Sequence, residues 1–131
     1  MSNSDGMEGV RYASETHGQP DSLSRLAPGE PRYLVTAGTP KGSGQVTYRT
    51  PDKFISGGVW GCSPGTFELT FGWDEMSYLL EGEIVIEEKG RQTITVRPGD
   101  FLNCPKGTKS RWVVTKACKK VFFLRSPEPM G

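Results

Sequence analysis

The sequence has one histidine in 131 residues, His17, which lies in a polar segment far upstream of the strand-like segments described below. Histidine is the commonest metal ligand among protein side chains. Because the chain has only one, a metal site built from several imidazole groups is excluded. No apolar run approaches the ~18 residues that a membrane-spanning helix needs. The first residues form neither a basic nor an apolar segment, and we therefore expect no signal peptide.

Cysteine is also scarce. Cys62, Cys104 and Cys118 are odd in number and irregular in spacing, which excludes a disulfide framework, and no Cys-x-x-Cys pair indicates zinc. A reducing, cytoplasmic setting fits this usage best. The formal net charge is only +1, which argues against an extended nucleic-acid-binding surface. We expect neither nucleic acid nor a membrane as a partner.

One region is unbalanced in charge, because residues 106–125 contain seven basic residues and no acidic one. Solvated strand faces, with lysines that protect a sheet edge, explain such a run. The alternative is a surface for an anionic ligand or partner. The basic residues are Lys106, Lys109, Arg111, Lys116, Lys119, Lys120 and Arg125.

The length suits one compact domain, which at this size buries roughly two-thirds of its unfolded surface and needs no disulfide. Residues 1–30 are rich in Ser, Gly, Asp, Glu and Pro, a composition that buries too little apolar surface to fold alone. We expect a flexible or arm-like leader over residues 1–30 and a single domain over residues 31–131.

From residue 33 onward, short strand-like segments alternate with turns rich in Gly and Pro. Residues 66–71 alternate polar and apolar side chains, the pattern of a half-buried strand. Residues 84–88 and 92–96 flank Lys89-Gly90-Arg91, a hairpin signal. We expect an all-β fold, an antiparallel β-barrel or jelly roll with at most one short helix. The other expected strands are 33–36, 45–49, 76–80, 101–104, 110–115 and 120–125.

Two motifs resemble the signatures of the cupin superfamily. The first runs from Glu75 to Gly82, and the second from Gly99 to Gly107. Residues 57–124 look like a single cupin domain. More narrowly, they resemble the branch that contains the cupin domain of ureidoglycine aminohydrolase. The resemblance implies a barrel with a small-molecule pocket inside it.

Metal-binding cupins supply two histidines and a glutamate from the first motif, and a third histidine from the second. By this resemblance the histidine positions fall on Leu69 and Phe71, or on positions 68 and 70, and on Ser110, so that only Glu75 is retained. One carboxylate and one hydroxyl are too few ligands for Fe(II), Mn(II) or Zn(II). We expect no metal and no other cofactor. An adventitious divalent ion on Glu68, Asp74 and Glu75 is the alternative.

The resemblance also implies which side chains line the barrel. Residues 110, 112 and 114 share one face of their strand, and in the family that face looks inward. An interior with an indole and a few polar groups is typical of a small-molecule site. In the alternative, Trp112 and Phe71 fill the space as a solid core. The candidate ligand-binding residues are Trp112, Ser110, Phe71, Leu69, Tyr78, Trp73 and Cys104.

Glu75 is the candidate catalytic residue. Burial raises the pKa of a carboxyl group, which is how a general acid or base near neutral pH is made. The alternative is a carboxylate paired with an Arg or Lys, or hydrogen-bonded to Tyr78 or Trp73.

The sequence thus predicts a metal-free cupin that binds a small polar or anionic metabolite. Acid–base chemistry of the isomerase, lyase or aminohydrolase type at Glu75 would accompany binding. The alternative is a non-catalytic dimeric cupin that serves as a sensor, accessory or scaffold protein. We expect a homodimer in either case, because open barrels have edge strands that need cover. The leader, with Tyr12, Leu23 and Leu26, offers an arm that could supply this cover.

Overall fold

The computed structural model describes residues 32–130, and its regular elements are eight β-strands. The expected all-β class is confirmed. None of the described segments is a helix long and apolar enough to cross a bilayer. The expectations for residues 1–30, including His17, Tyr12, Leu23 and Leu26, lie outside the described residues. The strands are β1 (Arg32–Ala37), β2 (Gly42–Arg49), β3 (Ile55–Cys62), β4 (Gly65–Thr70), β5 (Asp74–Glu87), β6 (Ile94–Val96), β7 (Phe101–Cys104) and β8 (Lys109–Arg125).

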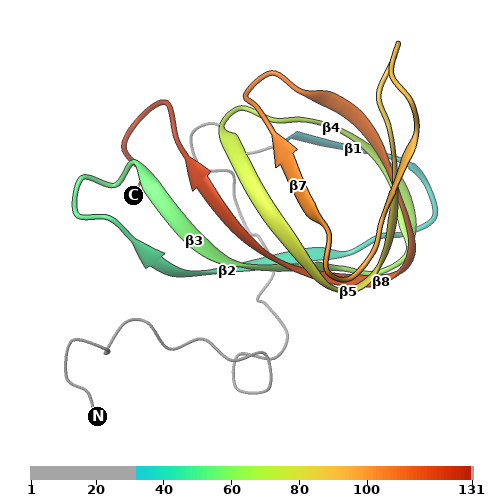
Figure 1. Cartoon of the computed structure of the whole chain (residues 1–131), viewed down its shortest axis with the longest axis horizontal. Helices are drawn as coiled ribbons and strands as arrows, with labels where there is room; N and C mark the ends of the chain where they lie inside the picture. The colour runs from blue at the N-terminus through green and yellow to red at the C-terminus, as the bar shows by residue number, and fades with distance from the viewer. Residues whose placement is uncertain (1–31, 131) are drawn as a thin grey trace.

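Two long strands, β5 and β8, organise the fold and lie side by side in Figure 1. They pair antiparallel from Asp74 opposite Arg125 to Glu87 opposite Arg111. The sequence predicts each of them as two shorter strands. The register shifts between Leu79 and Ile84, around Gly82 with its φ of 90°, so both strands bend there without ending.

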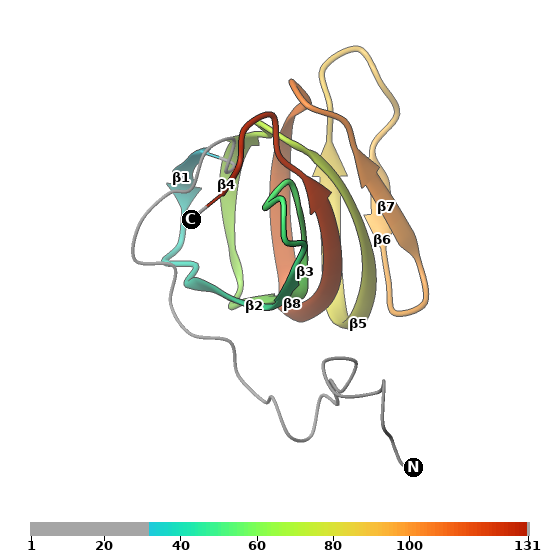
Figure 2. The ribbon, with the colours of Figure 1, turned by 90° about the vertical axis from the view of Figure 1, so that its left-hand side faces the viewer.

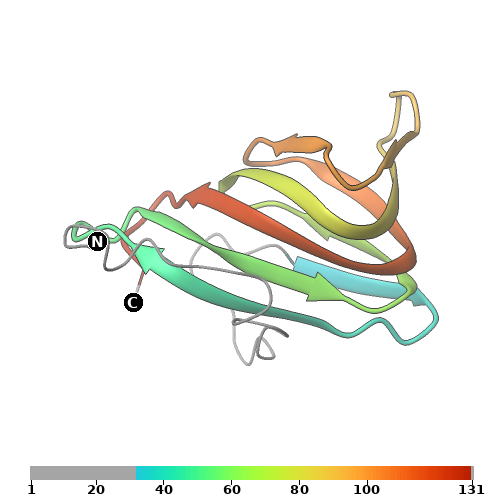
Figure 3. The ribbon, with the colours of Figure 1, turned by 60° about the horizontal axis from the view of Figure 1, so that its bottom comes forward.

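Because β5 and β8 bend, each belongs to two half-sheets. The first half-sheet has the order β1-β4-β8-β5-β6 and uses residues 109–114 of β8 and 84–87 of β5. The second half-sheet has the order β2-β3-β8-β5-β7 and uses the other ends of the two long strands. Figures 2 and 3 show the whole sheet curled around one interior.

The curl is open, because β1, β2, β6 and β7 each pair with a single neighbour among the described strands. The interior is filled by side chains that alternate along the strands, as the polar and apolar pattern of residues 66–71 predicts. Phe67 and Leu69 on β4 and Trp112 and Val114 on β8 are all buried. The inner face of the curl therefore holds both the core and the candidate site.

Candidate functional site

A buried ion pair lies on the inner face of the second half-sheet. The ammonium nitrogen Nζ of Lys120 on β8 donates a hydrogen bond to Oε2 of Glu75 on β5 over 2.6 Å. The two side chains are only 7% and 6% exposed. The indole Nε1 of Trp73 donates to the other carboxylate oxygen, Oε1, over 2.9 Å. Both oxygens of Glu75 are therefore engaged, as in the paired alternative considered from the sequence.

Two indole rings enclose the ammonium group. Nζ of Lys120 lies 5.0 Å from the ring centroid of Trp60 and 4.9 Å from that of Trp112. The two indoles meet edge to face at 6.1 Å and 87°. The electron-rich faces of indole rings attract a cation at this distance. Strands β3 and β8 thus build an aromatic cage around a lysine whose counterion comes from β5.

The cage has more hydrogen-bond donors than acceptors. An ammonium group carries three N–H donors, and Lys120 gives one of them to Glu75. The indole Nε1 of Trp60 is buried and has no acceptor among the described residues. A buried donor without a partner is costly, so this arrangement suits an added acceptor.

Trp112 is also a packing residue. Its ring centroid lies 6.1 Å from that of Phe67 and 6.2 Å from that of Phe71, and the residue is 1% exposed. Its Nε1 donates to Oγ of Ser110 over 2.9 Å. Trp112 and Phe71 therefore pack together, as the solid-core alternative requires.

The structure brings most of the predicted site residues to the interior and places one elsewhere. Tyr78 is partly exposed, and its ring packs on Phe101 of β7 at a centroid distance of 5.2 Å. Successive strand residues point to opposite faces, so Tyr78 cannot share the inner face of Glu75. The prediction that Tyr78 neighbours Glu75 is wrong for this reason. The buried members of the predicted set are Leu69, Phe71, Trp73, Glu75, Cys104, Ser110 and Trp112.

Two residues of the cage, Lys120 and Trp60, are missing from the predicted set. Lys120 belongs to the basic run that we expected to be solvated, and it is 6% exposed; its neighbour Lys119 is 8% exposed. For these two lysines that expectation is wrong, whereas the other five basic residues are exposed. Continuing the alternation from 110, 112 and 114 along β8 to 118 and 120 would have placed Lys120 inside.

The three thiols are buried in the same interior, and their burial disfavours the thiolate form. Burial raises the pKa of Cys104, which is paired opposite Glu75, to about 12. Burial likewise raises the pKa of Cys62 to about 12 and that of its cross-strand neighbour Cys118 to about 11. The thiolate is the nucleophilic form of cysteine, so these residues do not support thiolate catalysis near neutral pH.

The site does not fit the metal that a cupin fold implies. By the motif resemblance the three histidine positions fall on Leu69 and Phe71, or on Glu68 and Thr70, and on Ser110, and the retained Glu75 is bound by Lys120. Among residues 32–130, no three His, Cys, Asp or Glu side chains lie together as a metal would need. That no metal is bound stays a prediction, but these residues supply no matching ligand set.

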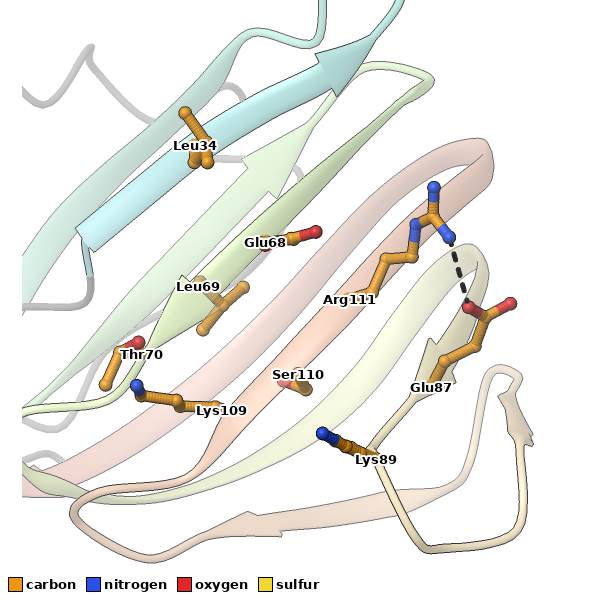
Figure 4. A pocket seen from close by; sticks show the side chains of 9 residues that line it. All are labelled: Leu34, Glu68, Leu69, Thr70, Glu87, Lys89, Lys109, Ser110 and Arg111. Atoms are coloured by element: carbon orange, nitrogen blue, oxygen red, sulfur yellow. Dashed lines mark ion pairs between the residues drawn. The ribbon is translucent and has the colours of Figure 1, made fainter.

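A separate hollow of ≈ 540 Å³ lies on the first half-sheet, and Figure 4 shows its side chains. Glu68 on β4, Arg111 on β8 and Glu87 on β5 are cross-strand neighbours there. Arg111 pairs with Glu87 at 3.6 Å. Lys89 and Lys109 also line it and pair with no described carboxylate. Two of the predicted site residues, Leu69 and Ser110, line this hollow as well.

The curled antiparallel sheet and the two motifs define a cupin. The chain belongs to the EutQ-like cupin domain family, whose model matches residues 49–122, more than half of the sequence. The comparison with curated proteins found no match.

Solved structures similar to this chain include the EutQ protein of Clostridium difficile, with 20% identity and a TM-score of 0.59 over 67% of this chain and 70% of that one. A protein of unknown function from Rhizobium leguminosarum has 17% identity and a TM-score of 0.58, with 65% and 81% covered. Another, from Pseudomonas syringae pv. tomato, has 22% identity and a TM-score of 0.62, with 80% of this chain but 46% of that chain covered. At these identities the likeness is one of fold.

Proposed function

We propose that this protein is a metal-free cupin that binds a small anionic metabolite inside the curl, with Lys120 as its built-in cation. The observation that carries the proposal is the surplus of donors around Lys120 and Trp60, two N–H groups of the ammonium and one indole N–H, with no described acceptor. A carboxylate or phosphate group supplies acceptors that match these donors and the charge.

The cost of the buried pair supports a functional role for it. Removing two charges from water costs several kcal/mol per ion. A protein in which well-packed apolar residues replace such a pair is often equally stable. Core packing alone therefore gives no reason for Lys120 and Glu75 at this place. In the metal-binding relatives that the motif resembles, the same glutamate faces a metal cation. Here an ammonium cation faces Glu75 at 2.6 Å.

Binding, rather than catalysis by a free carboxylate, is the activity that the resting arrangement supports. Both oxygens of Glu75 are engaged by Trp73 and Lys120. An anion that approaches Lys120 competes with Glu75 for the ammonium. Glu75 freed in this way could take a proton from the bound molecule, so isomerase, lyase or aminohydrolase-type chemistry would be a consequence of binding.

The narrower resemblance to the ureidoglycine aminohydrolase branch supports a shared fold and no more. We do not carry its activity over. The resemblance implies a metal-dependent reaction in that branch, whereas the ligand positions here fall on Leu69 and Phe71, or on Glu68 and Thr70, and on Ser110.

Iodide provides a direct test, since it is an anion that quenches tryptophan fluorescence on contact. Trp60 and Trp112 flank Lys120 and are 5% and 1% exposed, so random collisions reach them poorly. We expect saturable quenching by iodide and none by the caesium cation. Lys120→Met should abolish it, whereas Lys119→Met, which removes a lysine paired with Glu81 at 3.8 Å, should leave it intact.

A thermal-shift screen then identifies the metabolite class. Small carboxylates and phosphate esters are compared with uncharged amides and alcohols of the same size. A ligand at a hundredfold excess over its Kd stabilises the protein by about 2.7 kcal/mol. Stabilisation by anions in the wild type but not in Lys120→Met supports the proposal. Equal quenching in both proteins, together with no anion that stabilises the wild type, contradicts it.

The alternative function, a non-catalytic sensor, accessory or scaffold protein, is favoured by the packing of Trp112 against Phe67 and Phe71. If no anion reaches Lys120, the interior is only a core. The functional surface then lies on the outside of the curl.

A further inference from the structure

The surroundings of Lys120 suit a nucleophile as well as a cation. The residue is 6% exposed, and its Nζ is joined to Oε2 of Glu75 by a hydrogen bond of 2.6 Å. The rings of Trp60 and Trp112 flank Nζ at 5.0 Å and 4.9 Å. Lysine in a desolvated, apolar setting is the side chain that attacks carbonyl groups and forms imines. Lys120 is therefore the candidate for covalent chemistry in this interior.

Glu75 supplies the base that such a reaction needs. An ammonium group is not a nucleophile, because its nitrogen has no free electron pair until one proton leaves. The hydrogen bond of 2.6 Å already joins the two atoms between which this proton moves. After the transfer both groups are neutral, and burying neutral groups costs less free energy than burying two ions. The short contact thus gives a free amine without a second base.

The hydrogen-bond donors around Lys120 match an imine better than a bound anion alone. The ammonium group has three N–H donors, and among the described residues Glu75 accepts one of them. A protonated imine, or iminium, has a single N–H, which Glu75 satisfies, and it keeps the positive charge opposite the carboxylate. The indole N–H of Trp60 is then the donor that still lacks an acceptor. A carboxylate on the same substrate supplies that acceptor.

We infer that Lys120 forms an imine with a small carboxylate that carries a ketone or aldehyde group, such as a 2-oxo acid. The inference deepens the proposed function and rests on it, since the anion must first reach Lys120. In a 2-oxo acid the carboxylate is bonded directly to the carbonyl carbon. A substrate joined to Nζ therefore keeps its carboxylate close to the nitrogen, which Trp60 and Trp112 flank.

The atoms of the reaction balance with these two side chains and the substrate. The electron pair of Nζ forms a bond to the carbonyl carbon, and the oxygen takes the proton held by Glu75. Glu75 next removes a proton from the nitrogen and gives it to the new hydroxyl group. The C–O bond then breaks, water leaves, and the electron pair on nitrogen forms the C=N bond. Ammonium, carboxylate and ketone have become iminium, carboxylate and water.

The iminium defines the class of reaction that follows. It accepts the electron pair that is released when a C–H or C–C bond at the neighbouring carbon breaks. Glu75 is by then a carboxylate again and takes up the proton when the broken bond is C–H. Proton transfer or bond cleavage beside a carbonyl group, the chemistry of isomerases and lyases, is therefore the activity that Lys120 and Glu75 support together.

Reductive trapping on the full chain tests the inference, with pyruvate as the probe and sodium cyanoborohydride as the reductant. Hydride adds to the iminium carbon and fixes a 1-carboxyethyl group on the lysine nitrogen. Peptide mapping by mass spectrometry compares the buried Lys120 with the exposed Lys109 in the same sample. Exposure alone makes Lys109 the more reactive of the two. Because the site holds Nζ beside its base and the bound substrate, we expect at least about tenfold more modification of Lys120.

Two variants serve as controls. Lys119→Met removes a lysine that is 8% exposed and should leave the modification of Lys120 unchanged. Lys120→Arg keeps a positive charge but has no amine, so it should lose the adduct at this position while Lys109 reacts as before. The comparison of Lys120 with Lys109 in the wild type needs no variant and remains decisive if Lys120→Arg fails to fold.

The outcomes separate this inference from anion binding. Saturable quenching by iodide with no excess modification of Lys120 would overturn the imine and leave the proposed function standing. The absence of both quenching and excess modification would overturn the two together. Excess modification of Lys120 that Lys119→Met retains supports the imine.

Discussion

At the scale of single residues, Lys120 and Glu75 dominate the interior. Each depends on the other, because a buried charge without its partner keeps the desolvation cost and loses the compensating attraction. Trp73 adds a hydrogen bond to the carboxylate, and two indole faces flank the ammonium. The pair is therefore a unit, and its energetics are visible only when its members are changed singly and together.

We predict that Lys120→Met lowers the free energy of unfolding by about 3–5 kcal/mol, since it leaves Glu75 buried and unpaired. Adding Glu75→Gln should restore most of this loss. Glutamine keeps the acceptor for Trp73 and removes the uncompensated charge. Urea unfolding of the two single variants and the double variant measures the coupling. Additive losses in the double variant would mean that the two groups act independently.

A second prediction concerns the thiols. Burial raises the pKa of Cys62 and Cys104 to about 12 and that of Cys118 to about 11. Almost no thiolate exists at pH 8, so a disulfide reagent such as DTNB should react slowly with the native protein. In urea all three should react at once. Rapid reaction of one native thiol, mapped by mass spectrometry, would show that its environment is more open than its burial indicates.

At the scale of elements, the bend in β5 and β8 creates the two half-sheets. Gly82 has a φ of 90°, and a Cβ there would lie 2.3 Å from the carbonyl oxygen of Ala117 on β8. Only glycine fits so close to the neighbouring backbone. The sequence indicates this point correctly as a bend, but it cannot show that the strands continue through it. Continuity depends on pairing with a partner more than thirty residues away.

We predict that Gly82→Ala destabilises the fold by at least about 2 kcal/mol, from backbone strain together with displacement of β8. Gly90→Ala is the matched control. Gly90 has a similar φ of 78°, but a Cβ there would have nothing within 4 Å, so only the strain of about 1 kcal/mol remains. Equal losses in thermal unfolding would mean that contact with Ala117 contributes nothing.

The candidate site could likewise be predicted only in part, because its residues meet through pairing of strands that are far apart in the sequence. Alternation along one strand places Ser110 and Trp112 inside, and the motif resemblance singles out Glu75. Neither reveals that Lys120 is the partner of Glu75, because the two residues are 45 positions apart and meet only through the pairing of β5 with β8. Tyr78 lies only three residues after Glu75 in the sequence. Strand geometry turns it to the opposite face.

At the scale of the whole molecule, the curl separates three environments. The interior holds the ion pair and the indoles, the first half-sheet has a charged outer face, and the second has an apolar one. The net charge of +1 hides this division. The interior and the two outer faces are therefore distinct surfaces, and variants can change one without changing the others.

Two carboxylates with lowered pKa values, Asp74 and Glu83, predict how the fold responds to acid. The backbone N–H of Lys106 and the guanidinium of Arg125 lower the pKa of Asp74 below its ordinary value of 3.8. The hydroxyl of Thr115 and nearby basic groups lower the pKa of Glu83 below 4.5. A carboxyl whose pKa is lower in the folded than in the unfolded chain stabilises the fold fully above its unfolded pKa. That stabilisation is lost as the pH falls through the folded value.

We therefore predict a constant free energy of unfolding between pH 5.5 and 7 from these two groups, and a decline below about pH 4.5. Urea unfolding at intervals of half a pH unit measures it. Asp74→Asn should lower stability at pH 7 and flatten the decline below pH 4, because the variant has no proton to take up at that position. Glu81→Gln, which changes a carboxylate whose side chain is 63% exposed, is the control and should leave the curve's shape unchanged. Stability that rises on acidification from pH 5 to pH 3 would contradict the assigned direction of these shifts, since it would require carboxyl groups that are more basic in the folded chain than in the unfolded one.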